Sequence, residues 1–261
     1  MNMKDIKAIA IPEGTVKKIE DSNGNIIWGS QTDFPYRRLE YIHFNGTDNW
    51  VQTIGIGCVT NGTRYYTITF SIDGAPTPMH SVILGKYDSA GAAVANRRFY
   101  LPEVDPTNGA RFGCGDKFSS YFSLSNNTKY KTSANLVNAK TLNYSLTNLS
   151  NNSTVISGQL VSSGTLANNV SLGVMGMADH TGYINANSSP QAGKVYEITY
   201  SNSSSSVSYH YLIPVQRKSD GAIGFYDPVV ASSSEKWIPL LGSVDANTMG
   251  PVVDEYWDLQ V

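Results

Sequence analysis

Charged residues are scarce in this chain of 261 residues: Asp, Glu, Lys and Arg make up only 15% of it, against roughly 25% in ordinary soluble domains. The formal net charge is −2, and the sequence has no run of lysines and arginines. A protein that binds nucleic acid needs a basic surface to neutralise the phosphates. The sequence therefore predicts no nucleic-acid partner, and a neutral surface rich in hydroxyl and amide groups.

Long apolar segments are missing as well. A helix that crosses a bilayer needs about 20 apolar residues, and without such a segment we expect no membrane insertion. The first residues, MNMKDIKAIAIPEG, place charges inside a short apolar stretch, so we expect no secretory signal. The two cysteines, Cys58 and Cys114, lie far apart without C-x-x-C spacing, which favours two reduced thiols over a disulfide.

The motifs of several enzyme classes are absent from the sequence. It contains no G-x-S-x-G elbow, P-loop, H-E-x-x-H or EF-hand loop. The segment GCGDKF (Gly113–Phe118) lacks the third glycine of a dinucleotide fingerprint, so we expect a glycine-rich turn. The four histidines never stand two or four residues apart, which excludes a local pair of metal ligands. We predict no catalytic residue, no metal site and no cofactor.

One pair of acids has a spacing that is relevant to glycoside hydrolysis. Glu103 and Asp105 alternate, so on a strand both side chains would point to the same face. A retaining glycosidase needs two carboxylates about 5 Å apart, but Pro106 follows at once and no third acid continues the pattern. Asp254 and Glu255 are adjacent and would point to opposite faces. We predict that the chain is not an enzyme, with a glycoside hydrolase as the less favoured alternative.

What the sequence does contain is a succession of strand-like segments. RYYTITFSI (Arg64–Ile72) alternates polar and apolar residues, and similar runs follow between turns rich in Gly, Asn, Asp and Pro. Such spacing is typical of an antiparallel sandwich. The stretch RLEYIHFNGTDNWVQT (Arg38–Thr53) reads as the hairpin that opens this sheet. His43 and His210 fall inside strand patterns, and we expect structural or surface roles for them.

Residues 1–30 look like a small separate β-unit. The runs TVKKIEDS and NIIW flank Asn23-Gly24, a dipeptide that suits a type I′ hairpin turn. So short a unit is not stable alone, and its apolar side chains need a surface from the next domain, a symmetry mate or another protein. We predict that the unit attaches to a partner or oligomerises, and that this contact buries the side chains of Ile9, Ile11, Ile19, Ile27 and Trp28.

Two segments of the chain resemble a known family. YRRLEYIHFNGTDNWVQTIGI (Tyr36–Ile56) resembles the opening, and YHYLIPVQRKSDGAIGFYD (Tyr209–Asp227) the closing signature, of concanavalin-like, laminin-G-like jelly-roll domains of phage and prophage structural proteins. The likeness spans residues 35–241, with strand pattern alone in the middle. His43-Phe44, the extra Asp48-Asn49 and Gln52 depart from the family pattern.

The resemblance implies an all-β fold, an antiparallel two-sheet jelly-roll sandwich over residues 31–242, preceded by the N-terminal hairpin module. Residues 243–261 would form a C-terminal tail that either docks elsewhere or packs on its own domain. It also implies a virion surface protein, such as a head fibre, tail fibre or receptor-binding component, assembled in the host bacterial cytoplasm. We expect a homo-oligomer, with a trimer as first choice, that contacts other virion proteins through residues 1–30.

Sugar binding is the activity that this composition permits. An aromatic platform for the sugar ring, with amides and carboxylates for its hydroxyls, is available from Tyr, Trp, Asn and Asp residues in loops. We predict binding of cell-surface or mucus glycans, and the alternative is a ligand-free decoration protein. The candidate ligand-binding residues lie in two loops and are Asp48, Asn49, Trp50, Asp179, His180 and Tyr183.

Overall fold

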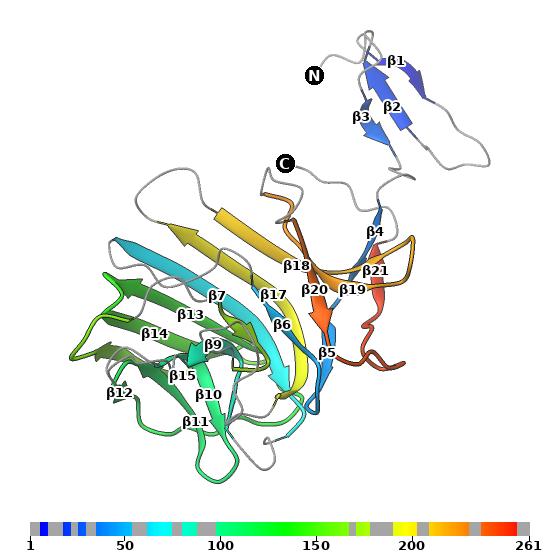
Figure 1. Cartoon of the computed structure of the whole chain (residues 1–261). Coiled ribbons are helices and arrows are strands. Elements are labelled where there is room, and N and C mark those ends of the chain that lie inside the picture. The colour runs from blue at the N-terminus through cyan, green and yellow to red at the C-terminus, as the bar shows by residue number, and fades with distance from the viewer. Residues whose placement is uncertain are drawn as a thin grey trace.

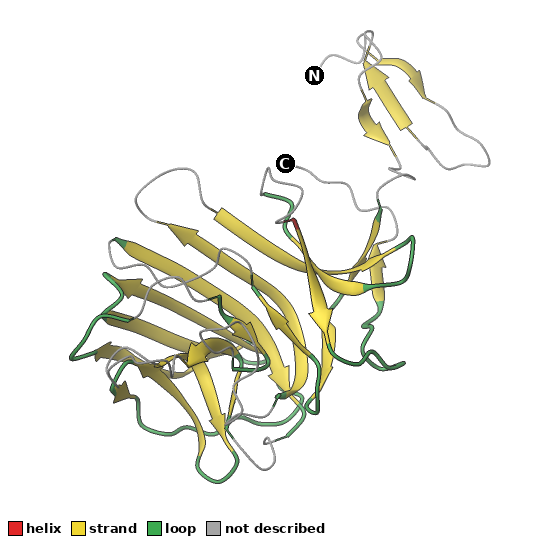
Figure 2. Ribbon diagram, in the orientation of Figure 1, coloured by secondary structure: helices red, strands yellow, loops and turns green. Residues whose placement is uncertain are grey.

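The structure, a computed structural model, is built almost wholly of antiparallel strands (Figures 1 and 2). It describes residues 6–9, 18–21, 26–29, 35–53, 62–74, 80–87, 98–166, 171–177, 190–202, 209–229 and 236–254. Among these residues no helix has the length and apolar character needed to cross a membrane. The all-β class predicted from the sequence is confirmed.

The N-terminal strands form a sheet of their own. β1 (Ile6–Ile9), β2 (Lys18–Asp21) and β3 (Ile26–Gly29) pair antiparallel in that order. The pairing of β2 with β3 agrees with the hairpin expected around Asn23-Gly24, whose turn lies outside the described residues. Of the predicted attachment residues, Ile9, Ile19, Ile27 and Trp28 are on these strands and Ile11 lies outside the described residues; their role stays a prediction.

The other strands, β4 to β21, belong to one connected unit. They are β4 (Tyr36–Leu39), β5 (Ile42–Asn45), β6 (Trp50–Gln52), β7 (Thr63–Ile72), β8 (Ser81–Val82), β9 (Leu84–Tyr87), β10 (Arg98–Asp105), β11 (Gly109–Cys114), β12 (Lys117–Phe118), β13 (Tyr130–Val137), β14 (Thr141–Asn148), β15 (Ser153–Val161), β16 (Gly173–Val174), β17 (Ala192–Asn202), β18 (Tyr209–Arg217), β19 (Ile223–Tyr226), β20 (Trp237–Leu241) and β21 (Val252–Asp254).

The pairing of these strands makes one large antiparallel sheet that is nearly closed as a barrel. It runs β15-β14-β13-β7-β17-β18-β19-β20-β6-β16-β9-β10-β11-β12. The structure does not resolve into the two distinct sheets that were predicted. The reason is that β18 pairs with β17 at one end and with β19 and β4 at the other, while β20 pairs with β19 at one end and with β6 at the other. These strands therefore carry the sheet from one layer to the next as corners.

The core lies between the two layers of this curled sheet. Alternate residues of β13 and β14 point inward; the sequence pattern predicted this alternation for β14 and not for β13. Phe112 of β11 stacks on Tyr144 of β14 with ring centroids 4.3 Å apart, which joins the layers directly. Each large apolar side chain buried in this way stabilises the fold by roughly 1.5–3 kcal/mol, and Phe44, Phe70, Phe99 and Phe225 are fully buried as well.

The segment expected to open the sheet as a hairpin does not form one. β5 pairs with β17, whereas β6 pairs with β16 and β20. Between them the side-chain oxygen of Asn45 accepts hydrogen bonds from the N–H groups of Thr47 and Asp48, at 2.9 and 3.2 Å. This Asx-type turn carries the chain to a different part of the sheet, so the hairpin prediction is wrong.

The chain ends of the large unit meet. β21, from the predicted tail, pairs antiparallel with β4, the first strand, and β4 pairs on its other edge with β18. In the described part of the tail the chain therefore packs on its own domain. The boundaries predicted at residues 30 and 242 stay predictions.

Candidate functional site

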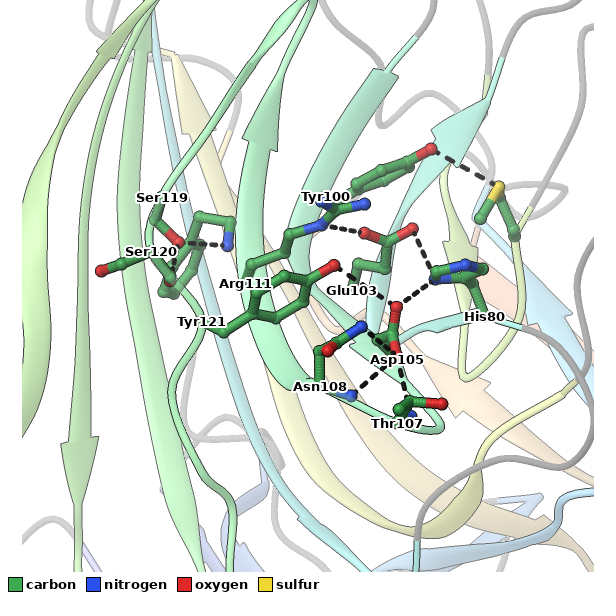
Figure 3. A network of polar contacts seen from close by, with 12 residues as sticks. His80, Tyr100, Glu103, Asp105, Thr107, Asn108, Arg111, Ser119, Ser120 and Tyr121 are labelled. Carbon is green, nitrogen blue, oxygen red and sulfur yellow. Dashed lines mark hydrogen bonds and ion pairs between the residues drawn. The ribbon is translucent and has the colours of Figure 1, made fainter.

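The outer face of β10 carries one group of charged and polar side chains that contact one another (Figure 3). Arg98 and Tyr100 alternate along the strand and share a face, and Glu103 and Asp105 do the same. The register against β11 shifts between Tyr100 and Glu103. Such a bulge re-aims the residues that follow it, and it places all four side chains on the same side of the sheet.

Glu103 forms the strongest contact of the site. It stands opposite Arg111 in the β10–β11 ladder, and the Arg111 Nε donates to Glu103 Oε2 at 2.6 Å. The side chain of Glu103 is 5% exposed and that of Arg111 21%. A charge-assisted hydrogen bond of this length, largely withdrawn from water, holds both side chains in fixed positions.

Asp105 is held by the turn that follows it. Its Oδ1 accepts hydrogen bonds from the N–H groups of Thr107 and Asn108, both at 2.8 Å, and its Oδ2 accepts one from the Tyr121 hydroxyl at 3.3 Å (Figure 3). Burial alone would raise the pKa of Asp105, but these hydrogen bonds and nearby His80 together lower it. The carboxylate is therefore ionised at neutral pH.

His80 lies between the two acids. Its Nδ1 is 3.4 Å from Glu103 Oε1 and 3.3 Å from Asp105 Oδ2. Neither contact has the geometry of a hydrogen bond, and the buried Nδ1 has no other hydrogen-bond partner. The ring as a whole is 42% exposed, so one face of His80 is open to solvent while its nitrogen borders both carboxylates.

Aromatic rings flank the two arginines. The Arg98 and Arg111 guanidinium carbons lie 5.1 and 3.9 Å from the centre of the Phe118 ring. The tight turn after β11, with Gly115 at φ 61°, brings Phe118 back beside the strand. This turn is the one predicted from GCGDKF. Within it, Gly113 stands opposite Tyr100, where a Cβ would come within 2.7 Å of the tyrosine ring.

These side chains surround a pocket of about 260 Å³. Its walls are His80, Tyr87, Arg98, Tyr100, Glu103, Arg111 and Met177. Tyrosine rings, cationic donors and a carboxylate acceptor thus meet in one hollow, which is the combination that orients a small polar ligand. Among the described residues, no group of His, Cys, Asp and Glu side chains is arranged to hold a metal ion.

The predicted ligand-binding residues lie elsewhere or outside the described chain. Asp48 is exposed and bonds to Ser243. Asn49 is fully buried, where its Oδ1 accepts the Asn45 N–H at 2.8 Å, and Trp50 is 7% exposed. The structure thus gives Asn49 and Trp50 structural contacts. Asp179, His180 and Tyr183 lie outside the described residues, and a glycan role for all six stays a prediction.

Two other histidines have acid partners that sequence reasoning did not find. His43 Nε2 lies 2.6 Å from Asp73 Oδ2, and His210 Nδ1 lies 2.7 Å from Asp227 Oδ2. Asp227 is fully buried and its Oδ1 also accepts the N–H groups of Tyr211 and Val229. Both pairs join neighbouring parts of the sheet, which fits the structural role expected of these histidines.

The pocket itself was missed from the sequence. The sequence predicts a strand end at Pro106, after Glu103 and Asp105, and β10 does end at Asp105. What the sequence concealed is the bulge before Glu103, which adds Arg98 and Tyr100 to the same face. Arg111 lies on β11 and His80 immediately precedes β8, and both reach the pocket because these strands pair with β10.

Comparisons with known proteins add little. No family model matches the sequence, and no curated protein matches it. A protein of unknown function from Shewanella oneidensis MR-1 superimposes with a TM-score of 0.37 and 15% identity, over 54% of this chain and 58% of that one. A sialidase of Trypanosoma rangeli, crystallised with a difluorinated KDN, gives 0.37 and 15% over 70% of this chain and 28% of its own.

A second structure of Trypanosoma rangeli sialidase gives a TM-score of 0.35 and 14% identity, over 74% of this chain and 33% of the sialidase. The chain therefore spans less than two thirds of each neighbour's length. At these TM-scores the likenesses carry no argument about function. The prediction that the chain is not an enzyme stays a prediction, as does its resemblance to phage jelly-roll proteins.

Proposed function

We propose that this chain is a carbohydrate-binding β-domain displayed on the surface of a bacteriophage particle, with the pocket beside β10 as its sugar site. The observation that carries the sugar-binding part is the pocket of about 260 Å³, in which Tyr87 and Tyr100 face the paired charges of Glu103 and Arg111. Sugars offer an apolar ring face to aromatic side chains and hydroxyls to charged ones. The phage setting rests on the resemblance of the opening and closing segments.

Display in many copies would suit a site of this size. One shallow pocket binds weakly, whereas several linked copies gain affinity through their high effective concentration. In this proposal residues 1–30 attach the chain to other virion proteins or to its own copies, in a trimer or another symmetric oligomer. The jelly-roll-like unit then points outward, and the particle forms in the host cytoplasm.

The sugar-binding part is tested on a glycan array with the intact chain. We expect wild type to bind a subset of glycans and Tyr87→Ala to reduce that binding about tenfold, since a ring–sugar contact is worth on the order of 1 kcal/mol or more. Tyr65→Ala is the matched control, because Tyr65 is an exposed tyrosine on another part of the sheet. A wild-type protein that binds no glycan would favour the ligand-free decoration protein.

The phage setting is tested on purified virions. We expect deletion of residues 1–30 to abolish incorporation into particles while the larger unit keeps its β-sheet circular dichroism spectrum. Normal incorporation of the truncated chain would remove the attachment role from residues 1–30. Absence of the chain from an electron microscopy map of the virion would reject the setting altogether.

Glycoside hydrolysis is a second candidate, favoured by one observation: Glu103 and Asp105 share a face and both border His80. Its difficulty is the need for a protonated acid, because Glu103 is bonded to Arg111 and the pKa of Asp105 is lowered. Release of reducing sugar from a polysaccharide by wild type, lost in Glu103→Gln, would establish hydrolysis. Binding without release would support the first proposal.

A further inference from the structure

Arg98 holds a position unlike that of its neighbour Arg111. Its guanidinium lies 5.8 Å from the Tyr87 ring centre and 5.1 Å from that of Phe118. Within the described part of the chain, no carboxylate and no hydrogen-bond acceptor meets this guanidinium. Arg98 is partly buried on the pocket wall, so its five N–H donors are partly withdrawn from water without a strong replacement.

Tyr100, next on the same face of β10, is in a similar condition. The residue is 2% exposed, and among the described residues its hydroxyl donates only to the Met177 Sδ, at 3.9 Å, which is a weak acceptor. Burial raises the pKa of the Tyr100 phenol, so the group stays protonated and remains a donor. Two adjacent wall residues therefore offer donors that protein atoms barely use.

The acids beside the pocket do not accept hydrogen bonds from Arg98 or Tyr100, because they are bonded to other groups. Glu103 is bonded to Arg111 at 2.6 Å, and Asp105 accepts from Thr107, Asn108 and Tyr121. Glu103, Arg111 and Asp105 are thus already paired or hydrogen-bonded, and among the described residues of the pocket Arg98 is the cation without a carboxylate partner. What is missing beside Arg98 and Tyr100 is an acceptor with negative charge.

We propose that the pocket selects sugars that carry a carboxylate, with Arg98 binding that carboxylate and Tyr100 donating to it or to a neighbouring hydroxyl. This inference rests on the proposed sugar-binding function and names its ligand class. A guanidinium presents two parallel N–H donors that match the two oxygens of a carboxylate. The rings of Tyr87 and Phe118 hold the guanidinium plane and shield the contact from water, which strengthens it.

The experiment compares two forms of one sugar. Binding of tri-galacturonate and of its fully methyl-esterified form is measured by calorimetry with the intact chain. The ester removes the charge and keeps the ring, so it cannot form the charge-assisted hydrogen bonds that a carboxylate forms with a guanidinium. We expect the acid to bind wild type at least about tenfold tighter than the ester. Arg98→Gln should bring this ratio close to one, and Arg98→Lys should keep part of it because the charge remains.

Arg217→Gln is the matched control. Arg217 also lies over an aromatic ring, 5.0 Å from the centre of Trp237, but it already bonds to Asp220. We expect the acid-to-ester ratio of this variant to equal that of wild type. Thermal unfolding of each variant verifies that the chain is folded under the conditions of the titration.

The possible results separate the two proposals. Equal binding of acid and ester by wild type would overturn the carboxylate proposal and leave sugar binding in place. A preference for the acid that Arg98→Gln keeps would also overturn it. Binding of a sulfated galactose oligomer with no binding of tri-galacturonate would replace carboxylate by sulfate and overturn it in that form. If neither these probes nor any array glycan bound, the sugar-binding function itself would fail.

Discussion

Two outer surfaces of the same curled sheet differ in how their polar groups are satisfied. We call the first the charged face; it consists of Arg98, Tyr100, Glu103, Asp105 and Arg111. The second, the amide face, crosses β13, β14 and β15 with one row of side chains, Asn135, Asn143 and Gln159. Along this row the Asn143 Nδ2 donates to Asn135 Oδ1 at 2.6 Å, and Gln159 Nε2 donates to Asn143 Oδ1 at 2.7 Å.

Hollow volume does not distinguish the two surfaces. The amide face has a hollow of about 310 Å³ lined in part by Tyr65, Asn135 and Asn143, and the charged face has one of about 260 Å³. The two surfaces differ in whether their polar groups are already hydrogen-bonded to other protein groups. Neutral amides on the amide face bind one another, whereas Arg98 and Tyr100 on the charged face meet no strong acceptor among the described residues. Unsatisfied polar groups, not volume, single out the candidate site.

The largest expected effect is on stability, from breaking the ion pair of the charged face. Glu103→Ala leaves the Arg111 guanidinium, 21% exposed, without its carboxylate. Loss of one partner of a largely buried pair costs about 3 kcal/mol. Urea denaturation of the variant and wild type measures this difference in the free energy of unfolding. A cost below about 1 kcal/mol would mean that water screens the pair as it does at a surface.

A pair of glycine substitutions separates packing from binding. Gly113→Ala places a Cβ 2.7 Å from a carbon of the Tyr100 ring, and Gly158→Ala places one 2.6 Å from the Tyr144 hydroxyl, beneath the amide face. Both should destabilise the chain by about 1–3 kcal/mol, because each ring must move. Only Gly113→Ala should weaken sugar binding, measured by calorimetry. Equal losses of binding in the two variants would show that the effect is general unfolding.

The fold could be predicted from the sequence to the level of strand alternation. Runs such as Arg64–Ile72 bury one face and show the period of two that this requires, so their strands were expected. The sequence did not predict that both layers join into one sheet, because this depends on which strands pair with the two ends of β18 and of β20. Residues 42–52 show where prediction from the sequence ends. Their alternation correctly indicated strands, but β5 pairs with β17, which is distant in the sequence, and no local turn motif predicts that pairing.

The site was less predictable for the same reason. Alternation places Glu103 and Asp105 on one face, and the sequence shows this spacing. It does not show the register shift after Tyr100, without which an odd step along the strand would put Tyr100 and Glu103 on opposite faces. Pro102 lies in the shifted segment and is a local sign of a bulge or an edge, because proline interrupts the hydrogen bonding of a strand, but the size of the shift is set by the pairing with β11. Arg111 and His80 then arrive through strand pairing, which pattern alone cannot give.

A smaller effect is expected from the pH dependence of the charged face. The pKa of Asp105 is lowered despite its burial, through the N–H groups of Thr107 and Asn108. A carboxyl with a lowered pKa stabilises the folded state above its unfolded pKa of about 3.9 and loses this contribution as pH falls below it. The Tm of wild type should therefore fall as the pH is lowered, and we expect Asp105→Asn to lack the part of this fall that is due to protonation of Asp105.

The size of this effect should be modest, about 1 kcal/mol, because an asparagine oxygen still accepts from the same N–H groups. Tm measured from pH 6 to pH 2 for wild type and Asp105→Asn tests it. The two curves should converge as the pH approaches 2. Parallel curves over the whole range would show that Asp105 is not the group that titrates.

The smallest effect is expected on the amide face, and it decides the comparison. Asn143→Ala removes both hydrogen bonds of the row, but Gln159 is exposed and Asn135 only partly buried, so water replaces the lost partner. The free energy of unfolding should change by no more than about 0.5 kcal/mol, and sugar binding should equal that of wild type. If Asn143→Ala instead abolished sugar binding while Tyr87→Ala did not, the ligand would bind on the amide face. The unsatisfied donors of Arg98 and Tyr100 would then have no part in recognition.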